Sequence, residues 1–179
     1  MKLSVIITAG GHGKRFDSSI PKQFLPLTDI PILMRTIDVF YNWNSEAEII
    51  LTLPKAWRSY WDGLVDQYEF KTEHVIVDGG KERYHSIKNA LSLCKGEHVL
   101  IHDGVRPLVN TQTLNRCMSA LKTKKAVVPF LAIKESIRLI QNNGSVSLDR
   151  KKHVRVQTPQ CFDTKLILKA YQGEYQSCF

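Results

Sequence analysis

Short apolar runs rich in valine and isoleucine alternate along this chain with longer segments in which apolar residues recur at helical spacing. The runs are LSVIITA (3–9), AEIILTLP (47–54), HVIVDGG (74–80), HVLIHDGVRP (98–107) and AVVPFLAI (126–133). The segments between them are PILMRTIDVFYNW (31–43), AWRSYWDGLVDQYEF (56–70), ERYHSIKNALSLC (82–94) and TQTLNRCMSALKTKK (111–125). Strands of this composition, each followed by a helix, predict an α/β fold with a mostly parallel sheet covered by helices on both faces.

Three of the predicted strands end in loops rich in glycine and charged residues. The loops begin with AGG at 9–11, DGGKER at 78–83 and HDGVRP at 102–107. In open sheets of parallel strands, ligands bind beyond the carboxyl ends of the strands. We therefore expect the three loops to meet at one edge of the sheet and to form the binding site.

The first of these loops, AGGHGKRF (9–16), has the composition of an anion-binding loop. A dinucleotide-binding G-x-G-x-x-G fingerprint fails at Phe16, and a Walker A loop fails because Arg15 stands where Ser or Thr is needed. The remaining pattern, G-x-G-x-R followed by a Pro-Lys pair, would surround one polyanion with Lys14, Arg15 and Lys22. A glycine-rich turn with solvated charges is the alternative explanation.

The length and the charge of the chain restrict its partners. Its 179 residues suffice for one well-buried core, so we expect a single domain over residues 1–179. Lys and Arg number 25 against 17 Asp and Glu, and the net charge of +8 by itself fits nucleic acid, an anionic surface or a phosphorylated small molecule. The basic residues are dispersed and no nucleic-acid-binding motif is recognisable, so we favour a phosphorylated small molecule and expect no nucleic-acid partner.

Apolar stretches and cysteines indicate the compartment. No uncharged stretch approaches the roughly 18 apolar residues of a membrane helix. The run at 3–9 is short for a signal peptide and leads directly into the glycine loop, so we expect a cytoplasmic protein without a membrane partner. The four cysteines form no C-x-x-C pair, and no histidines are paired at zinc spacing, so we expect reduced thiols and Mg²⁺ as the metal.

Asp103 closes the fourth predicted strand, beside His102 and shortly before Arg106. A carboxylate at this point suits a Mg²⁺ ion that also binds a triphosphate, whereas a structural salt bridge with Arg106 is the alternative. We interpret the histidine as a packing or hydrogen-bonding residue rather than a general base. No covalent nucleophile is required if the substrate supplies its own phosphate oxygen and the loop cations stabilise the developing charge.

The alternation of strands and helices stops after residue 133. The segments SIRLI (136–140) and SVSLDR (145–150) flank Asn143 and Gly144, and Asn-Gly between alternating apolar residues indicates a hairpin. We predict a protruding β-hairpin arm over about 134–157. A second copy of the chain would cover its apolar residues, so we predict a homodimer formed through the arm, with a hairpin folded back onto its own domain as the alternative.

Six motifs in register resemble the 2-C-methyl-D-erythritol 4-phosphate cytidylyltransferase family of the non-mevalonate isoprenoid pathway. They are AGGHGKRF, PKQF, DGGKERYHSI, HDGVRP, LDR and QTPQCF, and the match that contains them runs from about residue 4 to 165. The resemblance implies a Rossmann-like three-layer sandwich with a dimerising arm. It further implies an enzyme that transfers CMP from CTP to 2-C-methyl-D-erythritol 4-phosphate, with Mg²⁺ as cofactor, and releases pyrophosphate.

The resemblance implies roles for individual residues. The nucleotide would be held by Ala9, Gly10, Gly11, Gly13, Gly80 and Ser86, with the last two reading cytosine. Arg15 and Lys22 would be the catalytic residues, acting on the triphosphate. The substrate-binding residues would be Asp103, Gly104, Arg106, Ser136, Arg150 and Thr158. Asp103 would also carry the metal, and the arm residues Ser136 and Arg150 would contact the methylerythritol phosphate of the neighbouring subunit.

The sequence also departs from the family. Thr8 stands where many members have proline, and Ser136 replaces threonine. The family continues with a Thr-Asp motif and an Asn-x-Lys motif beyond YQGEYQSCF (171–179), so we expect the C-terminal part of the family domain to be missing here. Two other functions remain open at this point. One is a cytidylyltransferase for ribitol 5-phosphate or another polyol phosphate, which shares PKQF and TPQ, and the other is an inactive nucleotide- or RNA-binding protein.

Overall fold

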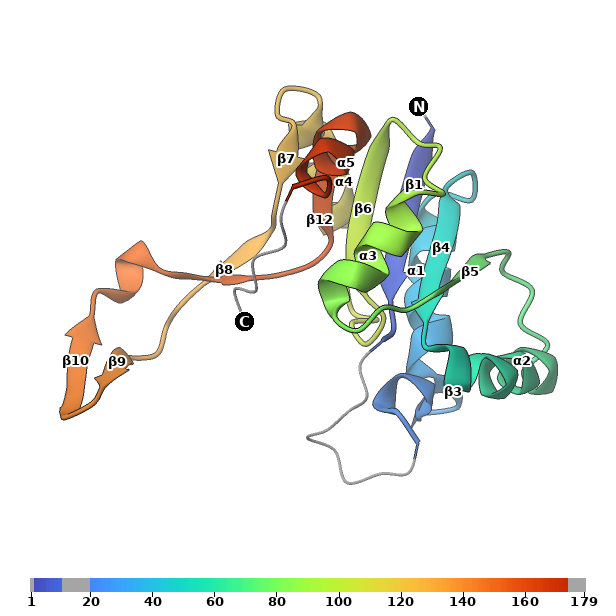
Figure 1. The fold of residues 1–179 in the computed structure, drawn as a ribbon, viewed down its shortest axis with the longest axis horizontal. Helices are drawn as coiled ribbons and strands as arrows, with labels where there is room; N and C mark the ends of the chain where they lie inside the picture. Colours follow the sequence, from blue (N-terminus) through green and yellow to red (C-terminus); the bar gives the residue numbers. More distant parts are fainter. Residues whose placement is uncertain (1, 11–19, 174–179) are drawn as a thin grey trace.

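A six-stranded sheet in the order β5-β4-β1-β6-β12-β7 forms the centre of the protein (Figure 1). The structure is a computed structural model that describes residues 2–10 and 20–173. Four neighbouring strands run parallel: β1 (Leu3–Thr8), β4 (Glu48–Leu53), β5 (Val75–Asp78) and β6 (His98–Asp103). β12 (Gln160–Asp163) runs antiparallel to both β6 and β7 (Ala126–Val127). The prediction of a mostly parallel sheet is confirmed.

Helices cover both faces of the sheet (Figure 1). They are α1 (Ile32–Trp43), α2 (Arg58–Gln67), α3 (Arg83–Leu91), α4 (Thr111–Leu121) and α5 (Thr164–Ala170). Apolar residues of α1, α2 and α4 belong to one buried cluster, and those of α3 and α5 belong to a second. The predicted three-layer arrangement is therefore confirmed. In the described ranges, none of the helices is both long and apolar enough to cross a bilayer.

The central strand explains why the predicted strands read as continuous apolar runs. Val5 and Ile7 of β1 pack into the first cluster, whereas Ile6 packs into the second. Successive side chains of a strand point to opposite faces, so a strand buried on both faces needs apolar residues at every position. All three side chains are fully buried.

The apolar run 126–133, predicted as a single strand, is split in the structure. β7 ends at Val127, and β8 (Phe130–Ala132) begins after Pro129. β7 pairs with β12 in the central sheet, whereas β8 pairs with β11 (Val154–Val156) in a separate ribbon. Proline has no N–H to donate to a neighbouring strand. The break at Pro129 therefore loses no hydrogen bond that this residue could have donated within the sheet.

Two of the elements that the sequence patterns missed, β12 and α5, belong to the main layers of the fold. The four residues of β12, QCFD, are too few to show a periodicity. They form a strand because they lie between β6 and β7 and hydrogen-bond to both. β12 thus returns the chain from the arm to the sheet, next to the strand that ends in Asp103.

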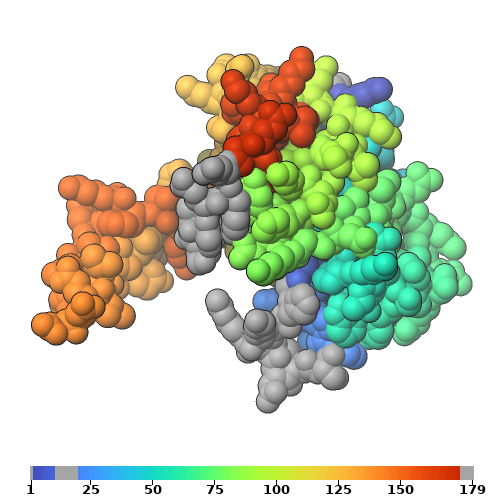
Figure 2. Space-filling model, viewed as in Figure 1, coloured from blue at the N-terminus to red at the C-terminus, as the bar shows by residue number. Residues whose placement is uncertain are grey.

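The predicted hairpin is present. β9 (Ile137–Gln141) pairs antiparallel with β10 (Gly144–Leu148), and Gln141 is the partner of Gly144. The turn is therefore Asn142-Asn143, one residue earlier than predicted, because Gly144 opens β10 with a φ of 139° that residues with a Cβ rarely adopt. The hairpin and the β8–β11 ribbon project away from the sheet, and Figure 2 shows them as a separate lobe (Figures 1 and 2). The alternative of a hairpin folded back onto the sheet is therefore wrong.

Shorter elements complete the described fold. They are β2 (Pro26–Leu27), β3 (Ile30–Pro31), and the 3₁₀ helices η1 (Lys22–Phe24), η2 (Lys55–Trp57) and η3 (Arg150–Lys152). η1 and η3 carry two of the residues with predicted roles, Lys22 and Arg150.

Replacement of Leu51 by alanine should lower the free energy of unfolding by about 2–5 kcal/mol, because the side chain is fully buried in the middle of β4. The matched control is Leu93→Ala, since Leu93 is 39% exposed, and it should change the free energy by less than about 1 kcal/mol. Urea denaturation measures both values. Equal losses in the two variants would contradict the assigned core.

Candidate active site

The loop after β5 and the start of α3 meet the end of β1 at the carboxyl edge of the sheet. The Gly80 N–H donates a hydrogen bond of 2.9 Å to Oγ of Ser86. A Cβ built on Gly10 would lie 3.4 Å from the same oxygen, and Ser86 is only 2% exposed. The structure therefore brings three of the predicted nucleotide-binding residues together, and their role stays a prediction.

Gly80 has no room for a side chain. An added Cβ would lie 2.2 Å from Cβ of His85 and 2.9 Å from its carbonyl carbon. Any larger residue would push the loop away from α3 and disturb the hydrogen bond to Ser86. The sequence signal for this constraint was the Gly79-Gly80 pair at the end of a predicted strand.

The PKQF segment is attached to the end of β1 by a side chain to which the sequence analysis gave no role. Nε2 of the buried Gln23 donates a 2.8 Å hydrogen bond to the carbonyl oxygen of Ala9. Phe24 is also buried, and its ring centroid lies 5.3 Å from that of Tyr60. With both neighbours fixed in this way, Lys22 is held exposed beside the carboxyl edge of the sheet.

Asp103 ends β6 and is clamped between two arginines. Its Oδ1 accepts a hydrogen bond of 3.2 Å from Nε of Arg83 and lies 3.2 Å from Nη2 of the same side chain. Its Oδ2 accepts a 2.8 Å hydrogen bond from Nε of Arg106. The salt bridge with Arg106, considered as an alternative to a metal site, is therefore present. Two guanidinium groups and one carboxylate leave this cluster with an excess of positive charge, which suits an anionic ligand.

The segment 157–160 supports this cluster from the other side. Gln157 Oε1 accepts a 2.9 Å hydrogen bond from Nη1 of Arg106, and Gln160 Oε1 accepts one of 3.2 Å from Nη1 of Arg83. Oγ1 of Thr158 accepts a 3.4 Å hydrogen bond from the N–H of Asp103. Thr158 was predicted to line the site, whereas Arg83 and the two glutamines were missed. The motifs that contain them, GGKER and QTPQ, were the available signal.

Gly104 lies directly behind Asp103 in a crowded position. Its N–H donates to the carbonyl oxygen of Thr8 at 2.9 Å, and its own carbonyl accepts a 2.9 Å hydrogen bond from Oγ1 of Thr36. A Cβ at this position would lie 2.9 Å from Cδ1 of Leu33. Any residue larger than glycine would therefore displace Leu33 or the backbone next to Asp103.

His102 is a buried packing residue, as the sequence analysis interpreted it. Its ring lies edge-on to that of Phe40 with a centroid distance of 4.9 Å, and Nε2 lies 3.0 Å from the carbonyl oxygen of Arg106. Burial lowers the pKa of His102 from 6.5 to about 4. The imidazole is therefore neutral at pH 7, and Nε2–H donates to this carbonyl.

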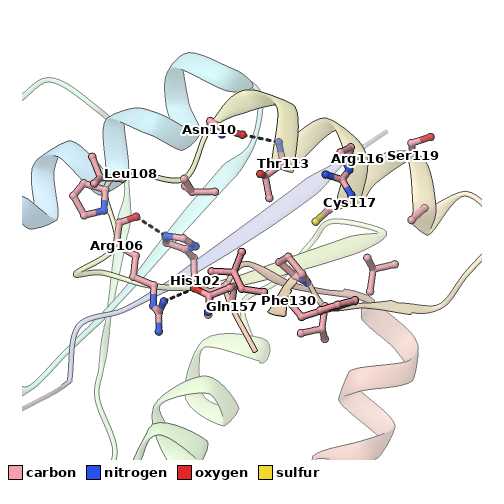
Figure 3. A pocket seen from close by; sticks show the side chains of 18 of the residues that line it. His102, Arg106, Leu108, Asn110, Thr113, Arg116, Cys117, Ser119, Phe130 and Gln157 are labelled. Atoms are coloured by element: carbon pink, nitrogen blue, oxygen red, sulfur yellow. Dashed lines mark hydrogen bonds between the residues drawn. The ribbon is translucent and has the colours of Figure 1, made fainter. Parts of the chain in front are cut away.

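A cavity of about 1080 Å³ opens between α4, the loop 105–110 and the segment that joins β7 to β8. We call Asp103 and its partners Arg83, Arg106, Gln157, Thr158 and Gln160 the Asp103 cluster. Three of its members, Arg106, Gln157 and Thr158, line the cavity. Figure 3 shows Arg106 and Gln157 at one end, and Arg116 and Cys117 of α4 further along the wall. The cavity thus adjoins the Asp103 cluster on the side that faces α4.

Of the remaining predicted site residues, the structure describes only those on the arm. Gly11, Gly13 and Arg15 fall outside the described residues. Ser136 and Arg150 are exposed and belong to the arm, which projects away from the sheet (Figure 1). Nη1 of Arg150 donates a hydrogen bond to the carbonyl oxygen of Lys134. This bond links the segment that leads into the hairpin to the segment that follows it.

Comparisons with known proteins agree with these motifs. The family model for 2-C-methyl-D-erythritol 4-phosphate cytidylyltransferase matches residues 3–179. The chain belongs to this family. It is 45% identical over 180 residues to the cytidylyltransferase of Phocaeicola vulgatus, covering 100% of this chain and 82% of that protein. It is 41% identical to that of Bacteroides fragilis, covering 98% of this chain and 81% of the relative.

Solved structures of the family share the fold. The 4-diphosphocytidyl-2C-methyl-D-erythritol synthase of Anaerococcus prevotii superposes with a TM-score of 0.83 at 27% identity, covering 99% of this chain and 78% of that one. The cytidylyltransferase of Thermus thermophilus gives a TM-score of 0.78 at 27% identity, covering 99% and 80%. The predicted family and the predicted enzyme class, a cytidylyltransferase of isoprenoid precursor synthesis, are thereby confirmed.

Gly80→Ala should raise the KM for CTP at least about tenfold, because the displaced loop loses its hydrogen bond to Ser86. The matched control is Gly63→Ala within α2, where an added Cβ meets nothing within 4 Å. That variant should keep its KM and gain about 0.5–1 kcal/mol of stability from better helix propensity. Steady-state kinetics and thermal denaturation measure both, and an unchanged KM in Gly80→Ala would contradict the role of this loop.

Proposed function

We propose that this chain transfers CMP from CTP to 2-C-methyl-D-erythritol 4-phosphate and releases pyrophosphate. Membership of the family supports this reaction. The structural observation that carries it is the position of the Asp103 cluster on the same sheet edge as the Gly10, Gly80 and Ser86 loop. A phosphate oxygen of the acceptor attacks the α-phosphorus of CTP, and the bond from that phosphorus to the oxygen bridging to the β-phosphate breaks.

The nucleotide occupies the two glycine loops in this proposal. Its base lies against the loop at Gly80, which the hydrogen bond from the Gly80 N–H to the buried Ser86 holds in one conformation. Its phosphates lie at Gly10 and Lys22, and Arg15 assists from outside the described residues. Lys22 stabilises the charge that develops on the departing pyrophosphate, since phosphoryl-type transfers are catalysed mainly by positioning and by electrostatic stabilisation.

Asp103 is the residue that would hold Mg²⁺. Its Oδ2 accepts a hydrogen bond from Nε of Arg106 and retains a second acceptor position, and oxygen ligands suit this ion. Within the described residues no group of three His, Cys, Asp or Glu side chains could hold a metal alone. When bound, Mg²⁺ would neutralise charge on the phosphates during the transfer.

The acceptor would reach Asp103 from the side of the cavity. Arg106 and Thr158 contact Asp103 and also line this space. The guanidinium group of Arg106 suits a phosphate group because it offers several donors in one plane. This arrangement agrees with the substrate-binding roles predicted for both residues.

We further propose a homodimer in which each arm completes the site of the other subunit. Phe130 and Val156 are directly opposite each other in the β8–β11 ribbon and are 61% and 53% exposed. Val154 shares their face and is 47% exposed. An apolar ribbon face of this kind needs a cover, since two strands alone are marginally stable in water. Ser136 and Arg150, on the same arm, would then contact the partner's acceptor phosphate.

The cytoplasm is the proposed location. CTP is consumed as a free nucleotide, and Cys94, Cys117 and Cys161 are free thiols, which suits a reducing compartment.

The chain should release pyrophosphate when CTP, Mg²⁺ and 2-C-methyl-D-erythritol 4-phosphate are all present. A coupled pyrophosphate assay measures this, with EDTA and the omission of either substrate as controls. Lys22→Ala should lower kcat by at least about 100-fold with little change in the KM for CTP, because the charge it stabilises develops in the transition state. Turnover with ribitol 5-phosphate, together with no turnover with 2-C-methyl-D-erythritol 4-phosphate, would overturn the proposed acceptor.

Mixed dimers test the shared site. Lys22→Ala and Arg150→Ala should each be poorly active alone, but the two chains produced together should regain up to about a quarter of wild-type activity. Half of randomly formed dimers contain one chain of each kind, and one of their two sites is intact. Sedimentation analysis confirms that the mixture is dimeric. No recovery in a dimeric mixture would show that each site is built from one subunit.

A further inference from the structure

Asp103 is held by two arginines that differ in origin. Arg106 follows it by three residues in the same loop, so their contact is local. Arg83 is 20 residues earlier in the chain, at the first position of α3, and reaches Asp103 across the sheet edge. Arg83 is therefore the side chain that ties the carboxylate to another layer of the fold.

Arg83 is itself fixed by protein acceptors. Its Nε and Nη2 both lie 3.2 Å from Oδ1 of Asp103, and its Nη1 donates a 3.2 Å hydrogen bond to Gln160. Each of its three nitrogens thus has a protein partner. Gln160 begins β12, which pairs with β6 in the central sheet, so this anchor belongs to a rigid element.

α3 also carries Ser86, one turn after Arg83, and Ser86 accepts the hydrogen bond from Gly80. The first turn of this helix therefore contacts both halves of the site, the glycine loop and the carboxylate. A change in the position of this turn would move both.

We propose that Arg83, anchored by Gln160, is a positioning residue that orients the Asp103 carboxylate for the transfer step and couples it to the nucleotide loop through α3. Arg83 acts through Asp103 and does not need to contact a substrate. Lysine cannot replace it fully, because a single ammonium group cannot bind Asp103 and Gln160 with the fixed fork of a guanidinium. This inference rests on the proposed function, since it assigns Asp103 its part in that reaction.

Arg83→Ala should lower kcat about 10–100-fold, the usual cost of losing a group that orients a functional ligand. The KM for CTP should change less than about threefold, because ground-state binding of the nucleotide is retained. Arg83→Lys should recover part of the loss. The protein should remain folded, because ion pairs with side chains as exposed as Arg83 (44%) contribute little stability.

Lys88→Ala is the matched control. Lys88 is an exposed cation on the same helix, with Nζ 6.0 Å from the centre of the Tyr84 ring. Its removal should leave kcat unchanged. A similar loss in both variants would show a general effect of positive charge on α3 and would overturn the proposal.

A double-mutant cycle with Asp103→Asn gives the decisive readout. If Arg83 acts through Asp103, then Arg83→Ala should change the residual kcat of Asp103→Asn by less than about threefold. Multiplying losses would mean that Arg83 acts on a substrate by itself, and a raised KM for CTP with an unchanged kcat would assign it to ground-state binding. Either result would overturn the proposal.

A crystallographic comparison separates this inference from the proposed reaction. The Asp103 side chain should occupy one orientation in the wild-type protein and several in Arg83→Ala. Absence of turnover in the wild-type protein would overturn the proposed function, while the crystal structures would still decide whether Arg83 orients Asp103. An Asp103 side chain that keeps its orientation in Arg83→Ala would overturn the positioning role, whatever the activity.

Discussion

The parallel pairing of β1 with β4 on one side and β6 on the other brings the end of β1 next to Asp103. Its register places Thr8 opposite both Thr52 and Asp103. The glycine loop after β1 and the carboxylate at the end of β6 therefore leave the sheet at the same level. A shift of one residue in this register would turn Asp103 to the opposite face of the sheet. The apolar side chains on both faces of β1 prevent that shift, because each of them is already buried.

Glutamine side chains hold the charged groups of the site in place. Gln23 attaches the segment of Lys22 to Ala9, Gln157 binds Arg106, and Gln160 binds Arg83. An amide accepts or donates hydrogen bonds without adding a charge. The site can therefore keep its excess of positive charge for phosphates while its cations are fixed. This division of tasks between charged and neutral side chains explains why the glutamines of PKQF and QTPQ lie beside the functional residues.

The layers of the fold could be predicted because they depend on local patterns. Four of the helices and the strands β1, β4, β5 and β6 were located by the spacing of apolar residues, since periods of 2 and 3.6 are visible in a short segment. The split of the run 126–133 and the strand β12 were missed. β12 is a strand because β6 and β7 leave a place between them. No property of its four residues indicates that place.

By itself, the sequence determined the family and the class of fold, and it predicted the loops at the sheet edge and the residues expected to act there. These conclusions depend on motifs whose residues are close together in the chain. Only the tertiary structure decided that Arg83 reaches Asp103, that Gln160 anchors Arg83 across a separation of 77 residues, and that the arm projects from the sheet with an exposed apolar face. Such contacts depend on the order and register of the strands. The order and register of the strands depend on the packing of the whole sheet, and the periodicity of a single segment does not reveal them.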